Sequence, residues 1–287
     1  MKRSKLFLVI GITFMVLSVS MVLYPTISNA INSFYSISTL KDYTKYSDTI
    51  SATDRLSLLS VAEKYNKTLR DTVSTFSYST DSLVDSYDDA LNFEDGLIGY
   101  IEIKKINVKL PIYHGSDPDV LKKGVAHIPN SALPTGGIGN NTVLSAHTGY
   151  PTQVFFDNLT ELTVGDTINI YVLDNTLTYK ITAKNIVEPD DTSLLNADDT
   201  KDLLSLITCY PYGVNSHRLI VTAERVIVSS THDEAIESTK SESKNSFEII
   251  ISAIIAFSTA AIIVTIARKR RKKYALYNDI SRKKCNL

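Results

Sequence analysis

The stretch DTINIYVLDNTLTYKITAKNIVEP, from Asp166 to Pro189, alternates apolar and polar residues on either side of a short polar centre. Alternation with a period of two is typical of a strand that buries one face. The centre, Asp174-Asn175, has residue types that turn a hairpin. The stretch therefore predicts a β-hairpin with one buried face, formed by Ile168, Ile170 and Val172 on the first strand and Leu177, Tyr179 and Ile181 on the second.

Short apolar segments of the same kind lie on both sides of this hairpin. They are YIEIKKINVKLPIYHG (100–115), NNTVLSAHTG (140–149), DLLSLITC (202–209) and RLIVTAERVIVSS (218–230). With the hairpin they amount to seven or eight short strands with few helices between them. Such a series predicts a mostly β fold, namely a closed antiparallel β-barrel over residues 97–228.

Residues 25–96 differ from this pattern and predict a helical, extracellular extension ahead of the barrel. Between Asp54 and Arg70, apolar residues recur every three or four positions, which is the period of an amphipathic helix. Thr53 or Asp54 is the predicted N-cap. The apolar stripe consists of Leu58, Val61, Ala62, Tyr65 and Leu69.

Two long uncharged segments lie near the ends of the chain. Leu6–Tyr24 and Ile249–Ala267 each contain 19 residues without a charge. About 20 apolar residues cross a bilayer as a helix, so both segments are long enough. Basic residues precede the first segment and follow the second, and basic flanks stay in the cytoplasm. The chain is therefore predicted to cross the cell membrane twice, with residues 25–246 outside and both termini inside.

These patterns divide the chain into six parts. The predicted order is the cytoplasmic N-terminus and first membrane helix (1–24), the helical and lid-like extension (25–96), the barrel (97–228), a polar tether (229–246), the second membrane helix (247–267) and a basic cytoplasmic tail (268–287).

Each membrane segment has an alternative interpretation. The first resembles a cleaved signal peptide, because Ser28-Asn29-Ala30 fits a small-residue cleavage site. The second, with its basic tail, resembles the sorting signal of a wall-anchored surface protein. That signal requires an LPxTG-like pentapeptide just upstream, and STHDEAIESTKSESKNSF (230–247) has none. Two retained helices are therefore the preferred interpretation.

The net charge and the two cysteines limit the possible functions of the protein. A formal net charge of -1 over 287 residues argues against nucleic acid, which requires a basic surface. Cys209 is predicted outside the cell and Cys285 inside, so the two cannot form a disulfide within one molecule. An unpaired cysteine in an exported domain indicates a reactive thiol or an intermolecular bridge. The alternative is a buried structural cysteine.

Cys209 ends one predicted strand and Arg218 begins the next. The connection YPYGVNSH contains a proline and a glycine, so it is predicted to be a turn. Paired strands lie about 4.8 Å apart, which would place the thiol and the guanidinium beside one cleft. Cysteine attacks as a thiolate. Arginine cannot accept a proton, so another residue must supply the base.

Histidine is the expected base, and the chain contains five histidines. His147 ends the predicted strand TVLSAH, so it lies at a strand end just as Cys209 does. Spacing alone favours His147 without excluding the others, which are His114, His127, His217 and His232.

Two segments, TVLSAHTGYP and LITCYPYGVNSHRLIV, resemble the signature of the sortase family. The resemblance extends to LIGYIEIKKINVKLPIYHG, GVAHIPNSALPTGG, FFDNLTELTVGDTINIYV and IVEPDDTSLL, which are similar to class C, pilus-building sortases. It covers most of residues 96–228. The resemblance therefore implies the sortase β-barrel fold and cysteine transpeptidase activity.

The resemblance implies roles for four residues. Cys209 would be the nucleophile, His147 the general acid and base, and Arg218 the stabiliser of the oxyanion or substrate. Thr208 belongs to the signature as a supporting residue; its alternative is an ordinary β-branched strand residue. The family requires no metal and no cofactor.

The resemblance also implies substrates and partners. Sortases cleave LPxTG-like sorting signals after the threonine and hold the acyl fragment as a thioester. In class C enzymes a lysine of another pilin subunit then takes the acyl group, which builds covalent pili on Gram-positive cells. The alternatives are transfer to a cell-wall peptide amine, hydrolysis by a cysteine protease, and a surface adhesin with a structural cysteine.

One family feature is missing from the sequence. Class C sortases usually have a lid with an Asp-Pro-aromatic motif ahead of the barrel. The segment 71–96 has no proline, and Asp117-Pro118 lies within the predicted barrel. A tightly held lid is therefore not expected, and Phe76 and Tyr78 are the candidates for a loose cover over the thiol.

Overall fold

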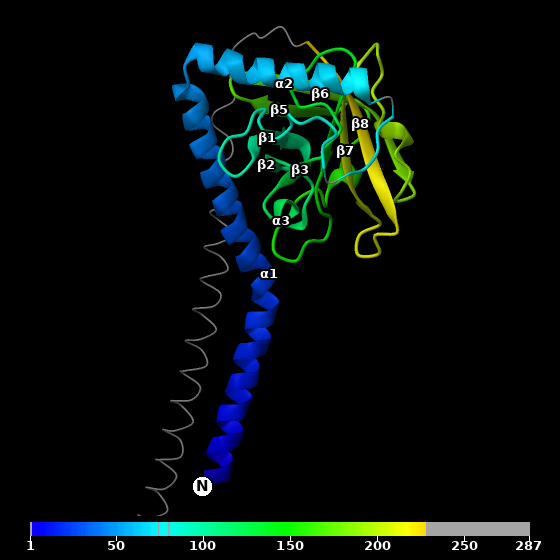
Figure 1. Cartoon of the computed structure of the whole chain (residues 1–287). Helices are drawn as coiled ribbons and strands as arrows, with labels where there is room; N and C mark the ends of the chain where they lie inside the picture. Colours follow the sequence, from blue (N-terminus) through cyan, green and yellow to red (C-terminus); the bar gives the residue numbers. More distant parts are fainter. Residues whose placement is uncertain (1, 74, 80, 228–287) are drawn as a thin grey trace, which may run out of the picture. The chain divides into compact units, whose positions relative to one another are not determined.

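A closed barrel of eight strands forms the centre of the molecule in the computed structural model, which describes residues 2–73, 75–79 and 81–227 (Figure 1). The predicted tether, second membrane helix and basic tail lie outside the described residues. The strands close in the order β1-β2-β3-β4-β7-β8-β6-β5. Their bounds are β1 Leu97–Ile103, β2 Val108–His114, β3 Val125–His127, β4 Asn140–Ser145, β5 Thr167–Val172, β6 Asn175–Val187, β7 Asp202–Tyr210 and β8 His217–Arg225.

The predicted hairpin is confirmed as β5 and β6. The two strands pair antiparallel, from Thr167 opposite Lys180 to Val172 opposite Asn175. All six apolar residues predicted to share its inner face are at most 5% exposed. The alternating pattern of side chains therefore determines which face of this hairpin enters the core.

The prediction of an antiparallel barrel is wrong for two of the pairings. Strands β2 and β3 pair in parallel, and so do β4 and β7. A crossover through the short helix α3 (Pro118–Leu121) allows β3 to run in the same direction as β2. The β5–β6 hairpin separates β4 from β7 along the chain. The barrel is therefore mixed, and β4 and β7 end at the same edge.

Two separate apolar clusters lie on the two faces of β4, β7 and β8. Leu144, Leu206 and Val221 belong to the main core inside the barrel. Their neighbours along the strands point outward, since successive strand residues face opposite sides. The outward cluster contains Phe76, Ile128, Val143, Leu195, Ile207 and Ile220.

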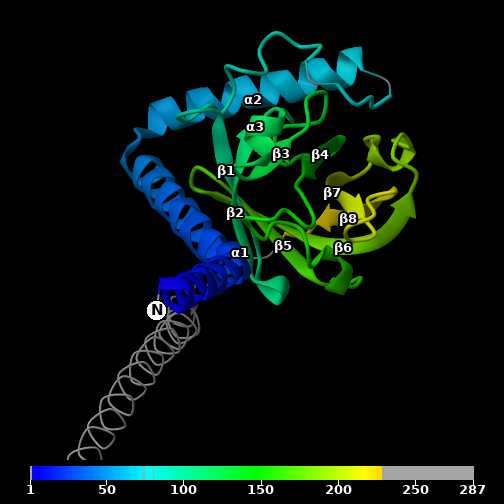
Figure 2. The ribbon, with the colours of Figure 1, turned by 90° about the horizontal axis from the view of Figure 1, so that it is seen from below.

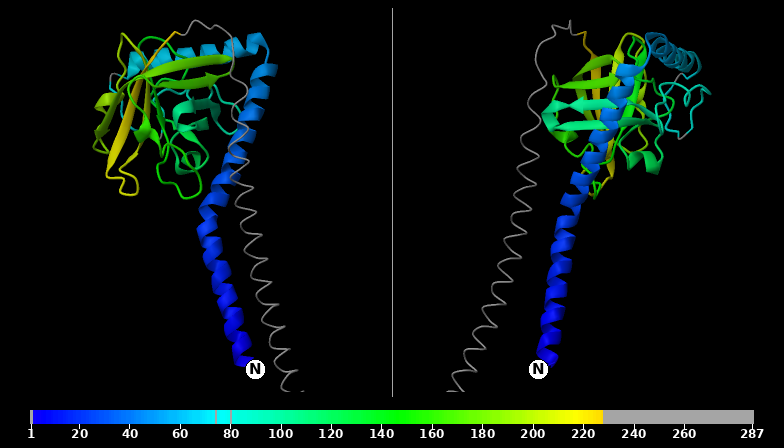
Figure 3. Two further views of the ribbon diagram at one scale, coloured as in Figure 1. Left: turned by 180° about the vertical axis from the view of Figure 1, so that it is seen from behind. Right: turned by 90° about the vertical axis from the view of Figure 1, so that its left-hand side faces the viewer.

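Two long helices precede the barrel, α1 (Lys2–Thr49) and α2 (Ala52–Thr72). Figures 1 and 3 show that α2 crosses one end of the barrel, while the N-terminal half of α1 extends beyond the other end. Figure 2, seen from below, shows the barrel with both helices along its outside. Among the residues that the structure describes, short 3-10 helices occur at Lys104–Ile106, Leu159–Glu161 and Ser193–Leu195.

Helix α1 combines an apolar N-terminal half with a half that contacts the barrel. Within the described residues it alone is long and apolar enough to be a membrane anchor or signal sequence. It continues through Pro25 without a break, into the segment that packs on the barrel. There the Tyr43 hydroxyl donates to the carbonyl of Ile98 at 2.8 Å and accepts from the amide of Leu173 at 2.8 Å.

Helix α2 confirms the predicted amphipathic helix, although its cap differs from the prediction. Ser51 is the N-cap, and its hydroxyl accepts from the amide of Asp54 at 3.1 Å. The buried face includes Asn66, whose side chain accepts from the amide of Leu133 and donates to its carbonyl. Arg70, near the end of α2, donates to the Asn140 side chain where β4 begins. Strand β4 therefore starts beside α2 and runs toward the opposite end of the barrel.

Candidate active site

Cys209 and Arg218 are directly opposite each other on antiparallel strands β7 and β8. Cys209 shares a strand face with Ile207, and Arg218 shares one with Ile220, because residues two apart point the same way. Since Ile207 and Ile220 belong to the outward cluster, the thiol and the guanidinium also face the outside of the barrel. The predicted juxtaposition of Cys209 and Arg218 is present.

His147 lies two residues beyond the end of β4, which runs parallel to β7. The last registered pair is Ser145 with Ile207, and the Ala146 amide still donates to the Ile207 carbonyl at 3.2 Å. Continuing this register by two residues brings His147 beside Cys209, on the same outward face. The three predicted site residues therefore gather where β4 and β7 end and β8 begins.

Thr208 connects the strand that carries the cysteine to the turn that carries the histidine. Its side chain points into the barrel and is 4% exposed. The Thr208 hydroxyl donates to the carbonyl of Ala146 at 2.8 Å and lies 2.5 Å from the hydroxyl of Thr148. It thus holds the residue before His147 and the residue after it.

Asp157 organises the turn that follows His147. Its two carboxylate oxygens accept from the amides of Gly149 and Phe155, each at 2.9 Å. The His147 ring stacks on Tyr150, with centroids 5.1 Å apart and planes 6° apart. Partial burial lowers the pKa of His147, and the Asp157 charge acts in the opposite direction. No short motif in the sequence marks Asp157, because it lies eight residues from Gly149.

Phe76 lies on the outward face of the barrel and is 6% exposed. It packs in the same cluster as Ile207 and Ile220. Its amide donates to the Asn196 side chain at 2.7 Å, and its carbonyl accepts from the Thr192 hydroxyl at 3.3 Å. The β6–β7 connection therefore holds Phe76 in place, although a tight hold was not expected in a segment without proline.

Tyr78 lies two residues further on, next to the gathered site residues. Its ring meets that of Phe76 edge-on, with centroids 5.9 Å apart. Although 46% of the residue is exposed, burial of its hydroxyl raises the pKa of Tyr78, and Cys209 adds to this rise. The Ser145 side chain and the Arg218 guanidinium oppose it. Tyr78 is therefore close to both Cys209 and Arg218.

The rival histidines have other surroundings. His127 is fully buried: its Nε2 donates to the Ala132 carbonyl at 2.9 Å, so its Nδ1 accepts from the Tyr87 hydroxyl at 2.9 Å. Burial lowers the pKa of His127 to about 3 and also lowers the pKa of the neighbouring His114. The remaining two are His217, 3.4 Å from Glu188, and His232, which lies outside the described residues.

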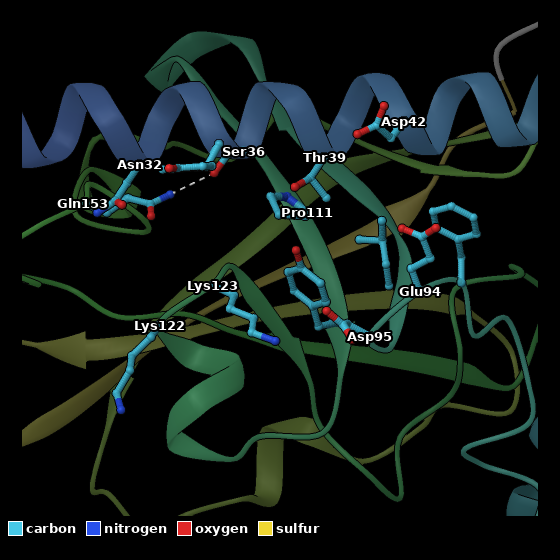
Figure 4. Close-up of a pocket in the computed structure, with 14 residues that line it drawn as sticks. Asn32, Ser36, Thr39, Asp42, Glu94, Asp95, Pro111, Lys122, Lys123 and Gln153 are labelled. Atoms are coloured by element: carbon cyan, nitrogen blue, oxygen red, sulfur yellow. Dashed lines mark hydrogen bonds between the residues drawn. The ribbon is translucent and has the colours of Figure 1, made fainter.

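A pocket of about 380 Å³ lies between α1 and the barrel, away from these residues (Figure 4). Its lining includes Asn32 and Asp42 of α1 together with Tyr113 and Lys123 of the barrel. None of Cys209, His147 and Arg218 lines it. The pocket is therefore separate from the candidate active site.

Comparisons with known proteins agree with this arrangement. The sortase domain model matches residues 101–226. Sortase D of Bacillus subtilis is 37% identical over 131 residues, which are 45% of this chain and 63% of that protein. The chain thus spans about 60–64% of the length of the first curated relatives it matches.

Solved structures match over most of their own length. Sortase C1 of Streptococcus agalactiae is 36% identical, with a TM-score of 0.63, over 66% of this chain and 98% of that one. Clostridium perfringens sortase C with the C-terminal cell wall sorting motif is 38% identical, with a TM-score of 0.60, over 67% and 100%. The relatives are named sortase A, C and D, so the names do not fix the class. The closed barrel, the gathering of Cys209, His147 and Arg218 at one edge of it, and the similarity to solved sortases agree with one another. The chain therefore belongs to the sortase family.

Proposed function

We propose that this protein is a cysteine transpeptidase that cleaves LPxTG-like sorting signals and passes the acyl fragment to an amine. The observation that carries the proposal is the pairing of Cys209 with Arg218, with His147 at the end of the adjacent parallel strand. A thiol, a proton carrier and a fixed cation on one face are the groups that acyl transfer requires. The similarity to a sortase C solved with the C-terminal cell wall sorting motif supports the substrate class.

The reaction proceeds in two halves. The Cys209 sulfur attacks the carbonyl carbon of the scissile threonine, and His147 gives a proton to the departing glycine amine. The carbon–nitrogen bond breaks as the carbon–sulfur bond of a thioester forms. His147, now neutral, then takes a proton from the incoming amine, which attacks the thioester and releases the thiolate. The acyl group leaves on a new amide bond.

Arg218 stabilises the negative charge that develops on the carbonyl oxygen in both halves. Two carbonyls of its own chain segment hold its guanidinium, since Nη1 donates to Asn215 at 3.2 Å and His217 at 3.0 Å. A donor that is positioned before the reaction need not reorganise in the transition state. Removing such a donor typically costs about 2.7–4 kcal/mol of transition-state stabilisation.

The acceptor that we propose is a lysine of another pilin subunit, so that repeated transfer builds a covalent pilus. Support comes from the similarity to the sortase C structures, because the match covers nearly their whole length. We further propose that α1 anchors the protein in the cell membrane, with the barrel outside, and that the C-terminal apolar segment returns the chain to the cytoplasm. The uncharged run of α1 and the basic residues before it support this orientation.

Tyr78 acts as a lid over the thiol in this proposal, and Phe76 anchors the lid. Phe76 is buried in one cluster with Ile207 and Ile220. These two isoleucines lie on the same outward strand faces as Cys209 and Arg218. The lid has to lift before a sorting signal can occupy the site. Its hold depends on the β6–β7 connection and not on an Asp-Pro anchor.

The proposed function is tested with the full chain in detergent, an LPxTG-type peptide and a purified pilin of the same cell. Mass spectrometry then distinguishes three products. Pilin joined to peptide through a lysine supports the proposal, and peptide joined only to a cell-wall amine added in parallel assigns the enzyme to wall anchoring. Peptide released as a free acid, whichever amine is present, would show a protease and contradict transfer.

A further inference from the structure

Two uncharged loops form the end of the barrel that carries the candidate active site. One, residues 148–156 (TGYPTQVFF), follows His147, and the other, residues 211–216 (PYGVNS), joins β7 to β8. Figures 1 and 3 show both loops at the end of the barrel that faces the N-terminus of α1, opposite α2. Tyr212 of the second loop packs close to Gly149 of the first. We name these two loops together the rim.

The rim is fastened to α1 through three consecutive residues of the first loop. Gln153, in the middle, is 5% exposed, so its contact is buried, whereas the contact of Val154 is exposed. The contacts are the Val154 amide to the Asn29 side chain at 3.0 Å, the Asn32 side chain to the Thr152 carbonyl at 2.9 Å, and the Gln153 side chain to the Ser36 hydroxyl at 3.2 Å.

These contacts fix the height of the rim along α1. Asn29 and Asn32 follow the predicted membrane-spanning run, which ends at Tyr24, by five and eight residues. At 1.5 Å per residue they lie about 7.5 and 12 Å beyond its end. The hydrocarbon layer is about 30 Å thick and the whole bilayer about 40–45 Å, so the headgroup layer on each side is about 5–8 Å deep. The rim is therefore held at the boundary between headgroups and water.

The side chains of the rim fit that boundary. Val154 is 49% exposed, and Tyr212 and Val214 are each 69% exposed. No residue of either loop carries a charge. Exposed aliphatic and tyrosine side chains without charges are typical of protein surfaces that lie in the membrane interface. Lys122, which is exposed just after α3, pairs with Asp119 at 2.8 Å, so this pair adds no net charge beside the rim.

The geometry points to a second membrane contact: the rim dips into the headgroup layer of the bilayer that α1 spans, and the lipid surface is its partner. This inference rests on the proposed membrane anchor and does not depend on the acceptor amine. Because β7 ends in the rim, Cys209 would work at the membrane surface, on sorting signals presented there. An enzyme on a flexible stalk would instead act at varied heights.

The chain has no tryptophan, so one introduced tryptophan reports its own surroundings. We would place Val214→Trp in the full chain, reconstitute it in vesicles that contain anionic lipids brominated near the headgroups, and measure fluorescence quenching. Ile138→Trp is the matched control, because Ile138 is also 69% exposed but directly precedes Gly139, which lies beside Arg70 at the α2 end. Tyr24→Trp reports insertion of α1.

Quenching at positions 24 and 214, with none at 138, is the expected result. An interfacial side chain buried about 5–10 Å into the boundary should lose about half of its fluorescence to such bromines. Quenching at 24 alone would overturn the rim contact and leave the rim to a protein partner. No quenching at 24 would overturn the anchor and the inference together, while transpeptidation in detergent would still report on the proposed function.

Discussion

Replacing Thr208 with valine tests how the site is aligned, because valine keeps the shape of threonine and removes only the hydroxyl. In the structure this hydroxyl donates to the Ala146 carbonyl at 2.8 Å and lies 2.5 Å from the Thr148 hydroxyl. Thr208 faces the barrel interior and does not face the substrate side. Its effect on the reaction must therefore act through the position of His147.

The magnitude follows from the two contacts. Ala146 is 3% exposed, and a buried carbonyl that loses its partner costs about 1–3 kcal/mol. We expect Thr208→Val to lower the free energy of unfolding by this amount. A misplacement of a catalytic group by about 1 Å can cost 10²-fold in rate, so we expect kcat to fall about 10- to 100-fold. KM should change little, since no substrate contact is lost.

The assay compares Thr208→Val with Thr208→Ser in the full chain in detergent. Cleavage of a fluorogenic LPxTG-type peptide in the presence of an amine gives kcat and KM, and urea unfolding followed by circular dichroism gives stability. Serine restores the hydroxyl and should restore most of kcat. Wild-type kcat in the valine variant, or equal losses in both variants, would refute the alignment argument.

Three further predictions concern single side chains. In a Cys285→Ser background, Tyr78→Ala should speed maleimide labelling of Cys209 several-fold, while Tyr78→Phe should not. Equal labelling rates in the parent and both variants would rule out Tyr78 as a lid. Arg218→Ala should lower kcat about 10²–10³-fold, with Arg218→Lys retaining part of it, because one oxyanion donor contributes about 2.7–4 kcal/mol; a loss under threefold would rule out the assigned role. Burial lowers the pKa of His127 from 6.5 to about 3, so between these values only the unfolded chain takes the proton. Stability should therefore fall as pH falls below 6.5, by about 2 kcal/mol at pH 5, and urea midpoints that do not change between pH 7 and pH 5 would contradict this.

Local patterns in the sequence predicted the strands well, because their information lies in neighbouring residues. The alternation from Ile168 to Ile181 follows directly from burial of one face of a hairpin. The stripe from Leu58 to Leu69 likewise predicted α2, although Ser51 rather than Thr53 or Asp54 caps it. Single-residue chemistry at a helix end is decided by backbone geometry, which the pattern does not encode.

Pairing between distant segments could not be predicted in the same way. Whether β4 pairs with β7 in parallel depends on the connection between them and not on the composition of either strand. This parallel pairing is nevertheless what brings His147 to Cys209. Asp157 and the burial of Phe76 were missed for the same reason, since their partners are separated from them in the chain by a turn or by more than a hundred residues.

The histidines show how far chemical reasoning alone could go. His147 was favoured because it ends a strand, and the structure places it at the same edge as Cys209 and Arg218. His127 also follows strand residues, yet it lies fully buried with both ring nitrogens bonded inside the fold. The sequence contains no signal that separates an inward from an outward imidazole until the strand faces are known.

The proposed reaction requires a covalent intermediate on Cys209, which intact-mass measurement detects. The full chain in detergent is mixed with an LPxTG-type peptide, without amine, and quenched in acid after increasing times. We expect a species heavier by the peptide up to its threonine, located on Cys209, sensitive to hydroxylamine and absent from Cys209→Ala. The same adduct on the Cys209→Ala variant, or peptide cleavage by that variant at the wild-type rate, would rule out Cys209 as the nucleophile.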